Sequence, residues 1–199
     1  MSRLPSSLGA CARSFFSFGS PRLLGLQLLA AIAARPFLGP PRASEALVVI
    51  AIAIYWPLQE WILHRYVLHM KPITLGGRTW VSRAVITHAL HHENPVELGP
   101  TLLPTSTIAL LVPIHVGGWL LLSPSLGFAC TGVACLGAAA LLYEWIHFLT
   151  HTAYKPRTRW FRDVKRRHMA HHMRDPMRWF AFTAPWLDDW LGTGDPRAS

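Results

Sequence analysis

Three long apolar segments dominate the pattern of hydrophobic and polar positions along the chain. The first, Ala46–Leu63, reads ALVVIAIAIYWPLQEWIL and carries a single acid, Glu60, near its end. The segments Leu102–Leu122 and Leu126–Ile146 follow, and only the short turn Ser123–Ser125 separates them. A helix needs about twenty predominantly apolar residues to cross the hydrocarbon core of a bilayer. We therefore predict three membrane-spanning helices in this part of the chain.

A shorter apolar stretch, Leu23–Ala34, precedes these segments and nears spanning length only when it is extended to Leu38. Because Arg35 interrupts the extension, the stretch either spans the membrane with a kink or lies in the interface. Residues 1–44 carry five arginines and no acid, a composition that also fits an organellar transit peptide. We favour a basic cytoplasmic tail followed by a first span, which makes four spans in total.

The composition supports a membrane protein and bears on its orientation. Of the 199 residues, 51% are hydrophobic and 15% are charged, whereas soluble domains carry about 25% charged residues. The net charge of +9 would suit nucleic acid only on a soluble basic face, which the apolar segments argue against. A solvated basic surface is the plain alternative. Since residues 151–199 carry ten lysines and arginines and residues 123–125 carry none, we place the polar segments on the cytoplasmic face, near anionic lipid.

The three cysteines, Cys11, Cys130 and Cys135, do not form a recognisable ligand or disulfide pattern. Their number is odd, no C-x-x-C pair occurs, and the last two lie inside an apolar segment. These features exclude a disulfide framework and a thiolate zinc site, and we interpret Cys130 and Cys135 as small core residues.

Ten of the eleven histidines fall into four clusters, and only His115 stands apart, inside an apolar segment. On a helix, H-x-x-H-H presents three imidazoles on one face, and H-x-x-x-H presents two rings one turn apart. H-x-x-x-x-H places its rings about 140° apart and suits the relaxed end of a helix. The clusters are His64 and His69; His88, His91 and His92; His147 and His151; and His168, His171 and His172.

This constellation indicates a site for two metal ions at one membrane face. A single zinc takes three or four protein ligands, whereas ten imidazoles suit two ions of five or six coordination. Imidazole binds iron, zinc, copper and nickel, so the ligand type does not choose the metal. Redox chemistry with oxygen needs iron or copper, and zinc serves hydrolysis or structure. A membrane metal transporter is an alternative, but it should place its ligands near the bilayer midplane, where only His115 lies.

Three stretches resemble the fatty acid hydroxylase and sterol desaturase superfamily of membrane di-iron proteins, and most of all fatty acid 2-hydroxylases. The first is EWILHRYVLHMKP at Glu60–Pro72, and the second is HALHHENP with a later Leu-Pro in the region His88–Pro104. The third is WFRDVKRRHMAHH at Trp160–His172, followed by FAFTAPWLDDWLGT at Phe180–Thr193.

The resemblance implies an all-α fold, with an integral-membrane bundle of about four helices under a cytosolic helical cap that carries the dimetal site. It places this domain at residues 45–199, after the basic tail and short apolar segment of residues 1–44. It makes all ten clustered histidines ligands of two metal ions, iron in the active form, with zinc as an alternative in a purified form. It also implies oxygen-dependent hydroxylation of a fatty acyl lipid, at carbon 2 in its closest members.

Two further expectations follow from the resemblance. No His-Pro-Gly-Gly haem motif occurs in the chain, so the electrons are expected to come from a separate donor protein. A carotenoid ring hydroxylase and a sterol or acyl desaturase of the same superfamily remain alternatives.

Acidic residues in or beside the clusters are candidates for orienting the rings. A ligating imidazole must be neutral, and its second N–H needs an acceptor. Glu144 lies three residues before His147, on the same face of a helix, and is the strongest candidate, while Asp188 belongs to the closing motif and is expected to cap the site. Balancing of nearby arginines is the alternative role for these carboxylates. The candidates are Glu60, Glu93, Glu144, Asp163, Asp175 and Asp188.

Overall fold

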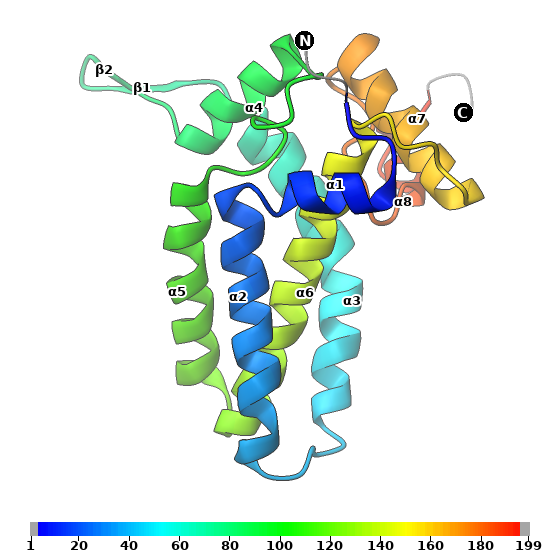
Figure 1. Ribbon diagram of the computed structural model, residues 1–199. Helices are drawn as coiled ribbons and strands as arrows, with labels where there is room; N and C mark the ends of the chain where they lie inside the picture. Colours follow the sequence, from blue (N-terminus) through cyan, green and yellow to red (C-terminus); the bar gives the residue numbers. More distant parts are fainter. Residues whose placement is uncertain (1–3, 196–199) are drawn as a thin grey trace.

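Four long helices stand side by side and form the lower part of the molecule, as the computed structural model of residues 4–195 shows (Figure 1). The central helix α6 packs against the other three. A mostly helical fold with an apolar bundle confirms the predicted fold class. The four helices are α2 (Gly19–Ala34), α3 (Glu45–Ile62), α5 (Thr105–Leu122) and α6 (Leu126–Thr150).

The bundle supplies three to four candidate membrane spans among the described residues. Three of them, Glu45–Leu68, Thr105–Leu122 and Leu126–Thr150, are long and apolar enough by themselves. The fourth is a bent pair, in which α1 (Leu8–Phe15) meets the stretch Gly19–Leu38 at 93°. Figure 1 shows that α2 stands in the bundle while α1 lies across its upper end. The stretch Leu23–Ala34, whose placement the sequence left open, thus packs in the bundle as part of a fourth helix. The domain division at residue 44 stays a prediction.

A partly buried ion pair accommodates Arg35 at the end of the bundle away from α4 and α7. Arg35 lies in the short helix η1 (Arg35–Leu38), and its Nη2 donates to Glu45 Oε1 at 2.7 Å. The same guanidinium also donates to the carbonyl of Gly39 at 2.7 Å and to the hydroxyl of Thr131 at 3.1 Å. Because the arginine is paired at the edge of the bundle, it need not enter lipid as an isolated charge.

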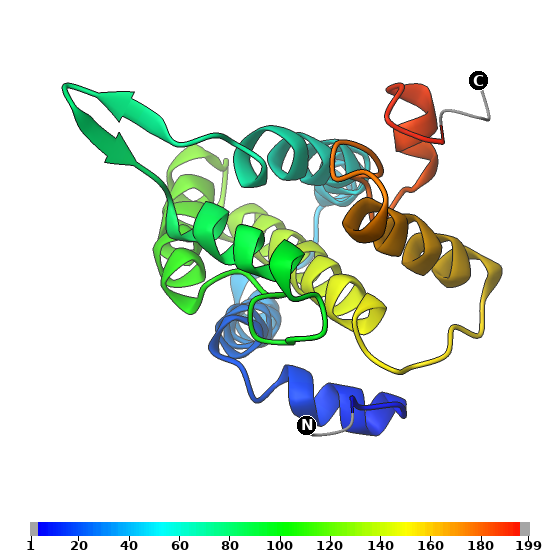
Figure 2. The same cartoon turned by 90° about the horizontal axis from the view of Figure 1, so that it is seen from above.

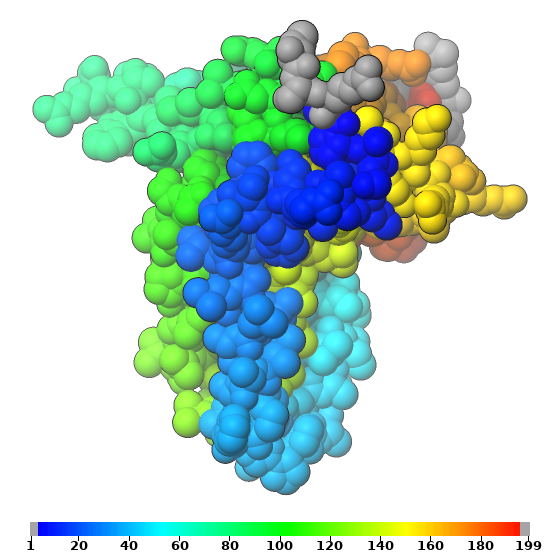
Figure 3. Space-filling view, in the orientation of Figure 1, coloured from blue at the N-terminus to red at the C-terminus, as the bar shows by residue number. Residues whose placement is uncertain are grey.

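A cap of shorter elements covers the other end of the bundle and extends beyond it on the side of a β-hairpin (Figures 2 and 3). Gly76 and Gly77 have φ values of 57° and 74°, which permit the two-residue turn of this hairpin. Serine and threonine caps start the two main cap helices, with Ser82 accepting from the N–H of Val85 and Thr158 from that of Phe161. The cap elements are η2 (Leu63–Leu68), β1 (Ile73–Leu75), β2 (Arg78–Trp80), α4 (Arg83–Glu93), α7 (Arg159–Met173) and α8 (Trp186–Trp190).

An aromatic core fastens the cap to the bundle. Phe15 of α1 and Phe148 of α6 are almost completely buried and lie edge-to-face with ring centroids 5.4 Å apart. Phe161 and Val164 on one face of α7 belong to the same buried cluster, as does Phe182. This cluster places α7 over the end of α6. All three cysteines are free, in agreement with the sequence analysis.

Replacing Gly132 by valine should destabilise the bundle by about 1–3 kcal/mol, because it overpacks the contact between α5 and α6. A Cβ at Gly132 would overlap the ring of Trp119, whereas a Cβ at Gly118 would meet nothing within 4 Å. Thermal unfolding in detergent measures the effect, and Gly118→Val is the matched control. Equal losses in both variants would contradict the packing explanation.

Candidate metal centre

The ten clustered histidines converge on two groups of five, at the end of the bundle covered by the cap. Within each group, one nitrogen from every ring lies within 4.8 Å of one nitrogen from each of the others. His115 lies in α5 and belongs to neither group. The first group is His64, His69, His88, His92 and His171, and the second group is His91, His147, His151, His168 and His172.

The two H-x-x-H-H motifs contribute to the groups in a reciprocal way. On α4, His88 and His92 join the first group and His91 joins the second. On α7, His171 joins the first group, while the outer two histidines of the motif join the second. A third element completes each group. His64 of η2 and the C-cap residue His69 after it join the first group, and His147 of α6 and the C-cap residue His151 after it join the second. Since both groups share α4 and α7, they are adjacent, and His92 stacks on His172 with ring centroids 4.3 Å apart.

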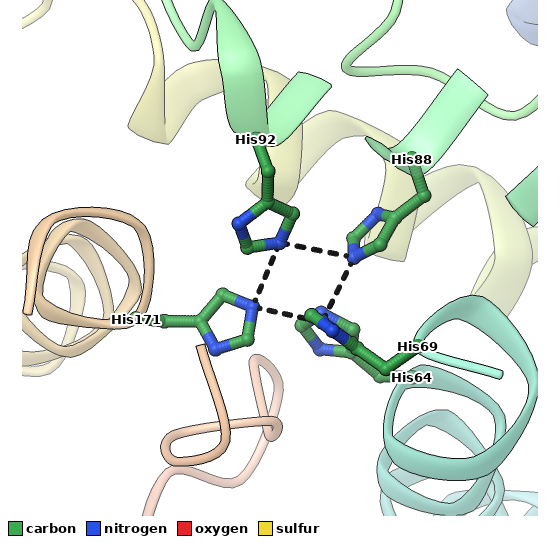
Figure 4. Close-up of side chains that lie close together, drawn as sticks. All are labelled: His64, His69, His88, His92 and His171. Atoms are coloured by element: carbon green, nitrogen blue, oxygen red, sulfur yellow. Dashed lines mark hydrogen bonds between the residues drawn. The ribbon is translucent and has the colours of Figure 1, made fainter. Parts of the chain in front are cut away.

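Four rings of the first group form a square of nitrogen atoms (Figure 4). The four sides measure 3.1 to 3.2 Å between Nε2 atoms, in the order His69, His88, His92, His171 and back to His69. Two nitrogens bound at right angles, each about 2.1 Å from one ion, are about 3.0 Å apart, so the square matches the ligand spacing of a single metal. The Nε2 of His64 is buried and has no hydrogen-bond partner within residues 4–195, so it is available as a fifth ligand.

Main-chain carbonyls fix the proton position on three rings. The Nδ1 atoms of His64 and His151 donate to the carbonyls of Phe180 and Pro95, each at 2.8 Å. His171 Nδ1 donates to the carbonyl of Arg178 at 2.6 Å. A carbonyl can only accept, so the Nε2 of each ring carries a lone pair instead of a proton.

This proton arrangement leaves lone pairs directed at one another. His171 Nε2 lies 3.2 Å from His69 Nε2 and 3.1 Å from His92 Nε2, although it has no proton to donate. Such nitrogens repel unless the partner ring carries a proton on the facing nitrogen or a cation lies between them. A bound metal ion satisfies all corners of the square at once, so the donor set fits a metal.

The second group has the same kind of contacts in a less regular arrangement. His147 Nε2 lies 3.1 Å from His91 Nε2, and His172 Nε2 lies 3.0 Å from His168 Nε2. His151 Nε2 approaches His168 Nε2 to 2.6 Å. Since one nitrogen from each of the five rings lies within 4.8 Å of those of the other four, the group is compact enough to hold a second ion.

Burial keeps the rings neutral, which is the form that binds metal. Loss of solvent and the neighbouring His69 lower the pKa of His92 to about 4. The pKa of His151 also falls to about 4, chiefly through burial, although its hydrogen bond to Pro95 opposes the shift. The pKa values of His88 and His171 lie well below the usual value for the same main reason. At neutral pH these imidazoles offer lone pairs without first losing a proton.

A π-helical turn explains the spacing of the first histidine cluster. The sequence places His64 and His69 about 140° apart on an α-helix, too far for one ligand face. In η2 the N–H of His69 instead bonds the carbonyl of His64 at 3.3 Å, a wider turn than in an α-helix. The two rings thereby lie close together, with their centroids 5.2 Å apart. The unusual spacing of five residues was the only sequence signal for this turn.

Two of the candidate carboxylates support the first group through the main chain. Glu60 Oε1 accepts from the N–H groups of Phe182 and Thr183 at 2.8 and 2.7 Å. Asp188 accepts from the N–H groups of Phe180 and Ala181 at 2.9 and 3.1 Å. Both buried acids thus hold the segment 180–183, whose Phe180 carbonyl orients His64.

The other candidate carboxylates have different partners. Glu144 is buried and accepts from the N–H of Leu103 at 3.2 Å. Asp163 pairs with Arg166 and Arg167, Asp175 pairs with Arg178, and Glu93 is exposed. Within residues 4–195, no candidate acid accepts a hydrogen bond from a clustered imidazole, contrary to expectation. Main-chain carbonyls accept the hydrogen bonds of His64, His151 and His171 instead. The sequence pattern could not reveal these acceptors, because the positions of the carbonyls depend on the tertiary fold.

A narrow pocket beside the segment 100–104 reaches both groups. His88 of the first group and His147 of the second line it together with Tyr143, Glu144 and Leu103. Its volume of about 10 Å³ has room for about one water molecule. Glu144 Oε2 is buried there and has no hydrogen-bond partner within the described part of the chain.

Curated relatives match about three quarters of the chain. A dihydroceramide fatty acyl 2-hydroxylase of Arabidopsis thaliana is 30% identical over 151 residues, which are 75% of this chain and 61% of the relative. A fatty acid 2-hydroxylase of Mus musculus is 22% identical over 145 residues, covering 72% of this chain and 38% of the relative. The chain thus spans about three fifths of the length of its plant relative, and less of the mouse protein.

A solved structure and a family model complete the comparison. Full-length scs7p, of which only the hydroxylase domain is visible, superposes with a TM-score of 0.66 at 19% identity, over 94% of this chain and 66% of the other. That likeness shows a shared fold. The fatty acid hydroxylase family model matches residues 49–193, which include every clustered histidine. The chain is a member of the fatty acid hydroxylase family.

Proposed function

We propose that the protein hydroxylates carbon 2 of a fatty acyl chain, with molecular oxygen and two iron ions held by the ten clustered histidines. The observation that carries this proposal is the convergence of ten imidazoles on two adjacent groups of five. Two oxygen-reactive ions side by side suit oxidation of an unactivated CH₂ group. The curated relatives above are named as acyl 2-hydroxylases, which supports carbon 2 as the position.

Bound iron would supply the oxygen activation needed to break a C–H bond. The balanced reaction converts one CH₂ group, O₂, two electrons and two protons into CHOH and water. We propose that a separate donor protein supplies these electrons. The carbonyls of Phe180, Pro95 and Arg178 keep the Nε2 atoms of three rings, His64, His151 and His171, free of a proton and available to a metal.

The narrow pocket beside His88 and His147 is the place where we expect the reacting carbon to lie. Carbon 2 is bonded to the carbonyl carbon of the acyl group, so polar groups of the protein should lie within a few ångströms of it. Tyr143 and Glu144 line this pocket, and Leu102 and Leu103 supply an apolar wall for the chain. Since the pocket is small, side chains must move to admit the acyl end.

The histidine groups are proposed to face the cytoplasm. They lie beside α4 and α7, at the end of the bundle opposite the loop after α2 (Figure 1). Residues 151–195 at this end carry nine lysines and arginines, a bias that the positive-inside rule associates with the cytoplasmic side. A soluble electron donor would reach the cap from that side.

Lipid profiling with isotopic oxygen tests the proposed reaction. Cells that express the protein should accumulate 2-hydroxy acyl lipids, and growth under ¹⁸O₂ should place the heavy isotope in the new hydroxyl group. A His91→Ala variant should form none of this product. If the acyl profile is unchanged, or if only carotenoids gain hydroxyl groups or only double bonds appear, 2-hydroxylation is the wrong assignment.

A further inference from the structure

A second, separate cavity lies at the lower edge of the cap, between α1, α6 and the first turn of α7. Its volume is about 330 Å³, at the lower end of the range for ligand sites. In Figure 3 the α1 residues (dark blue) lie directly beside the segment that leads into α7 (yellow). Its apolar lining includes Leu8, Leu142, Trp145, Leu149, Trp160 and Phe161.

The segment 155–162 forms one rim of this groove, through Arg157, Thr158, Trp160 and Phe161, and it carries four cations. Lys155, Arg157, Arg159 and Arg162 are all exposed, and Arg157 itself lines the groove. Within residues 4–195 no carboxylate forms an ion pair with any of the four, since Asp163 pairs with arginines further along α7. This rim segment therefore brings unneutralised positive charge to one edge of an apolar groove.

The groove lies at the level where the long helices end. Figure 1 shows α1 and the first turn of α7 at the height of the upper ends of α5 and α2. Leu142 on the outer face of α6 is 52% exposed, so the lower part of the groove opens toward the lipid around the bundle. Trp145 and Trp160 also line it, and tryptophan is enriched at the membrane–water interface.

We propose that this groove binds an anionic phospholipid. One acyl chain lies along Leu142, Trp145 and Leu149, and the headgroup phosphate contacts Arg157, with Lys155 and Arg159 beside it. The charge of the rim favours an anionic headgroup over a zwitterionic one. The opening toward the bilayer favours a lipid over free phosphate or an acidic protein. No histidine of either group lines this groove. Lipid binding here is therefore a proposal independent of the proposed hydroxylation.

Native mass spectrometry of the full chain in detergent tests this proposal. The wild-type protein should retain phosphatidylglycerol more strongly than phosphatidylcholine of the same acyl composition. The double variant Arg157→Gln with Arg159→Gln should lower the retention of phosphatidylglycerol by about tenfold. The matched control, Arg78→Gln with Arg83→Gln, removes the same charge from exposed positions in and beside the hairpin and should leave retention unchanged.

Three results would overturn the proposal. One is equal retention of the two lipids by the wild-type protein, a comparison that needs no variant to fold. Another is an equal loss in both double variants, which would mean that diffuse charge and not this groove attracts the lipid. The third is complete displacement of phosphatidylglycerol by inorganic phosphate at fixed ionic strength, which would indicate an anion site without a chain-binding groove.

Discussion

A His171→Ala variant should lose about half of its bound metal and reduce hydroxylation by at least about a hundredfold. His171 occupies a corner of the nitrogen square, with its Nε2 3.1 Å from that of His92 and 3.2 Å from that of His69. Alanine removes this donor and leaves the first group with four rings. The second group keeps all five of its rings. Elemental analysis of the purified variant gives the metal content, and product formation gives the activity.

His115→Ala is the matched control, because His115 is the one histidine outside both groups. It lies in α5, is only partly buried and should leave metal content and turnover unchanged. If His171→Ala retains full metal and activity, the square is not a metal site. If His115→Ala loses metal as well, the loss reflects general damage to the fold.

Glu60→Ala should weaken metal binding by about ten- to a hundredfold although Glu60 does not contact any ring of either group. Its carboxylate accepts the buried N–H groups of Phe182 and Thr183, and alanine would leave both donors without a partner. The segment would then shift, and with it the Phe180 carbonyl that orients His64 at 2.8 Å. Competition with a chelator of known affinity measures the change.

Glu60→Gln separates this positioning role from a role of the charge. An amide oxygen can accept the same two N–H groups, so the glutamine variant should keep most of the metal affinity. If the glutamine variant loses as much affinity as the alanine variant, the negative charge matters and the hydrogen bonds alone do not explain the effect. Unchanged affinity in the alanine variant would show that the segment is held without Glu60.

The shared helices make the two metal groups one structural unit. Each H-x-x-H-H motif divides its rings between both groups, so α4 and α7 cannot separate without breaking both. A ligand that binds only the folded form stabilises that form. Bound metal should therefore stabilise the arrangement of the cap, in addition to its chemical role.

Much of the membrane architecture follows from local sequence patterns. Apolar segments of spanning length predict α3, α5 and α6, because a bilayer imposes length and hydrophobicity on a helix without regard to its neighbours. Whether residues 23–38 span the membrane stayed open from the sequence, because an isolated Arg35 is unfavourable in lipid. Only packing beside α6 and pairing with Glu45 show how this segment joins the bundle.

The sequence by itself determined three of the spans, the number of clustered rings and the helix faces that those rings share, because length, hydrophobicity and helical spacing are properties of the local chain. The tertiary structure alone decided how those rings divide between two centres, and which carbonyls hold His64, His151 and His171. It also decided that a π-helical turn joins His64 to His69. These features depend on the relative placement of segments distant in the chain, and spacing along one segment carries no information about that placement.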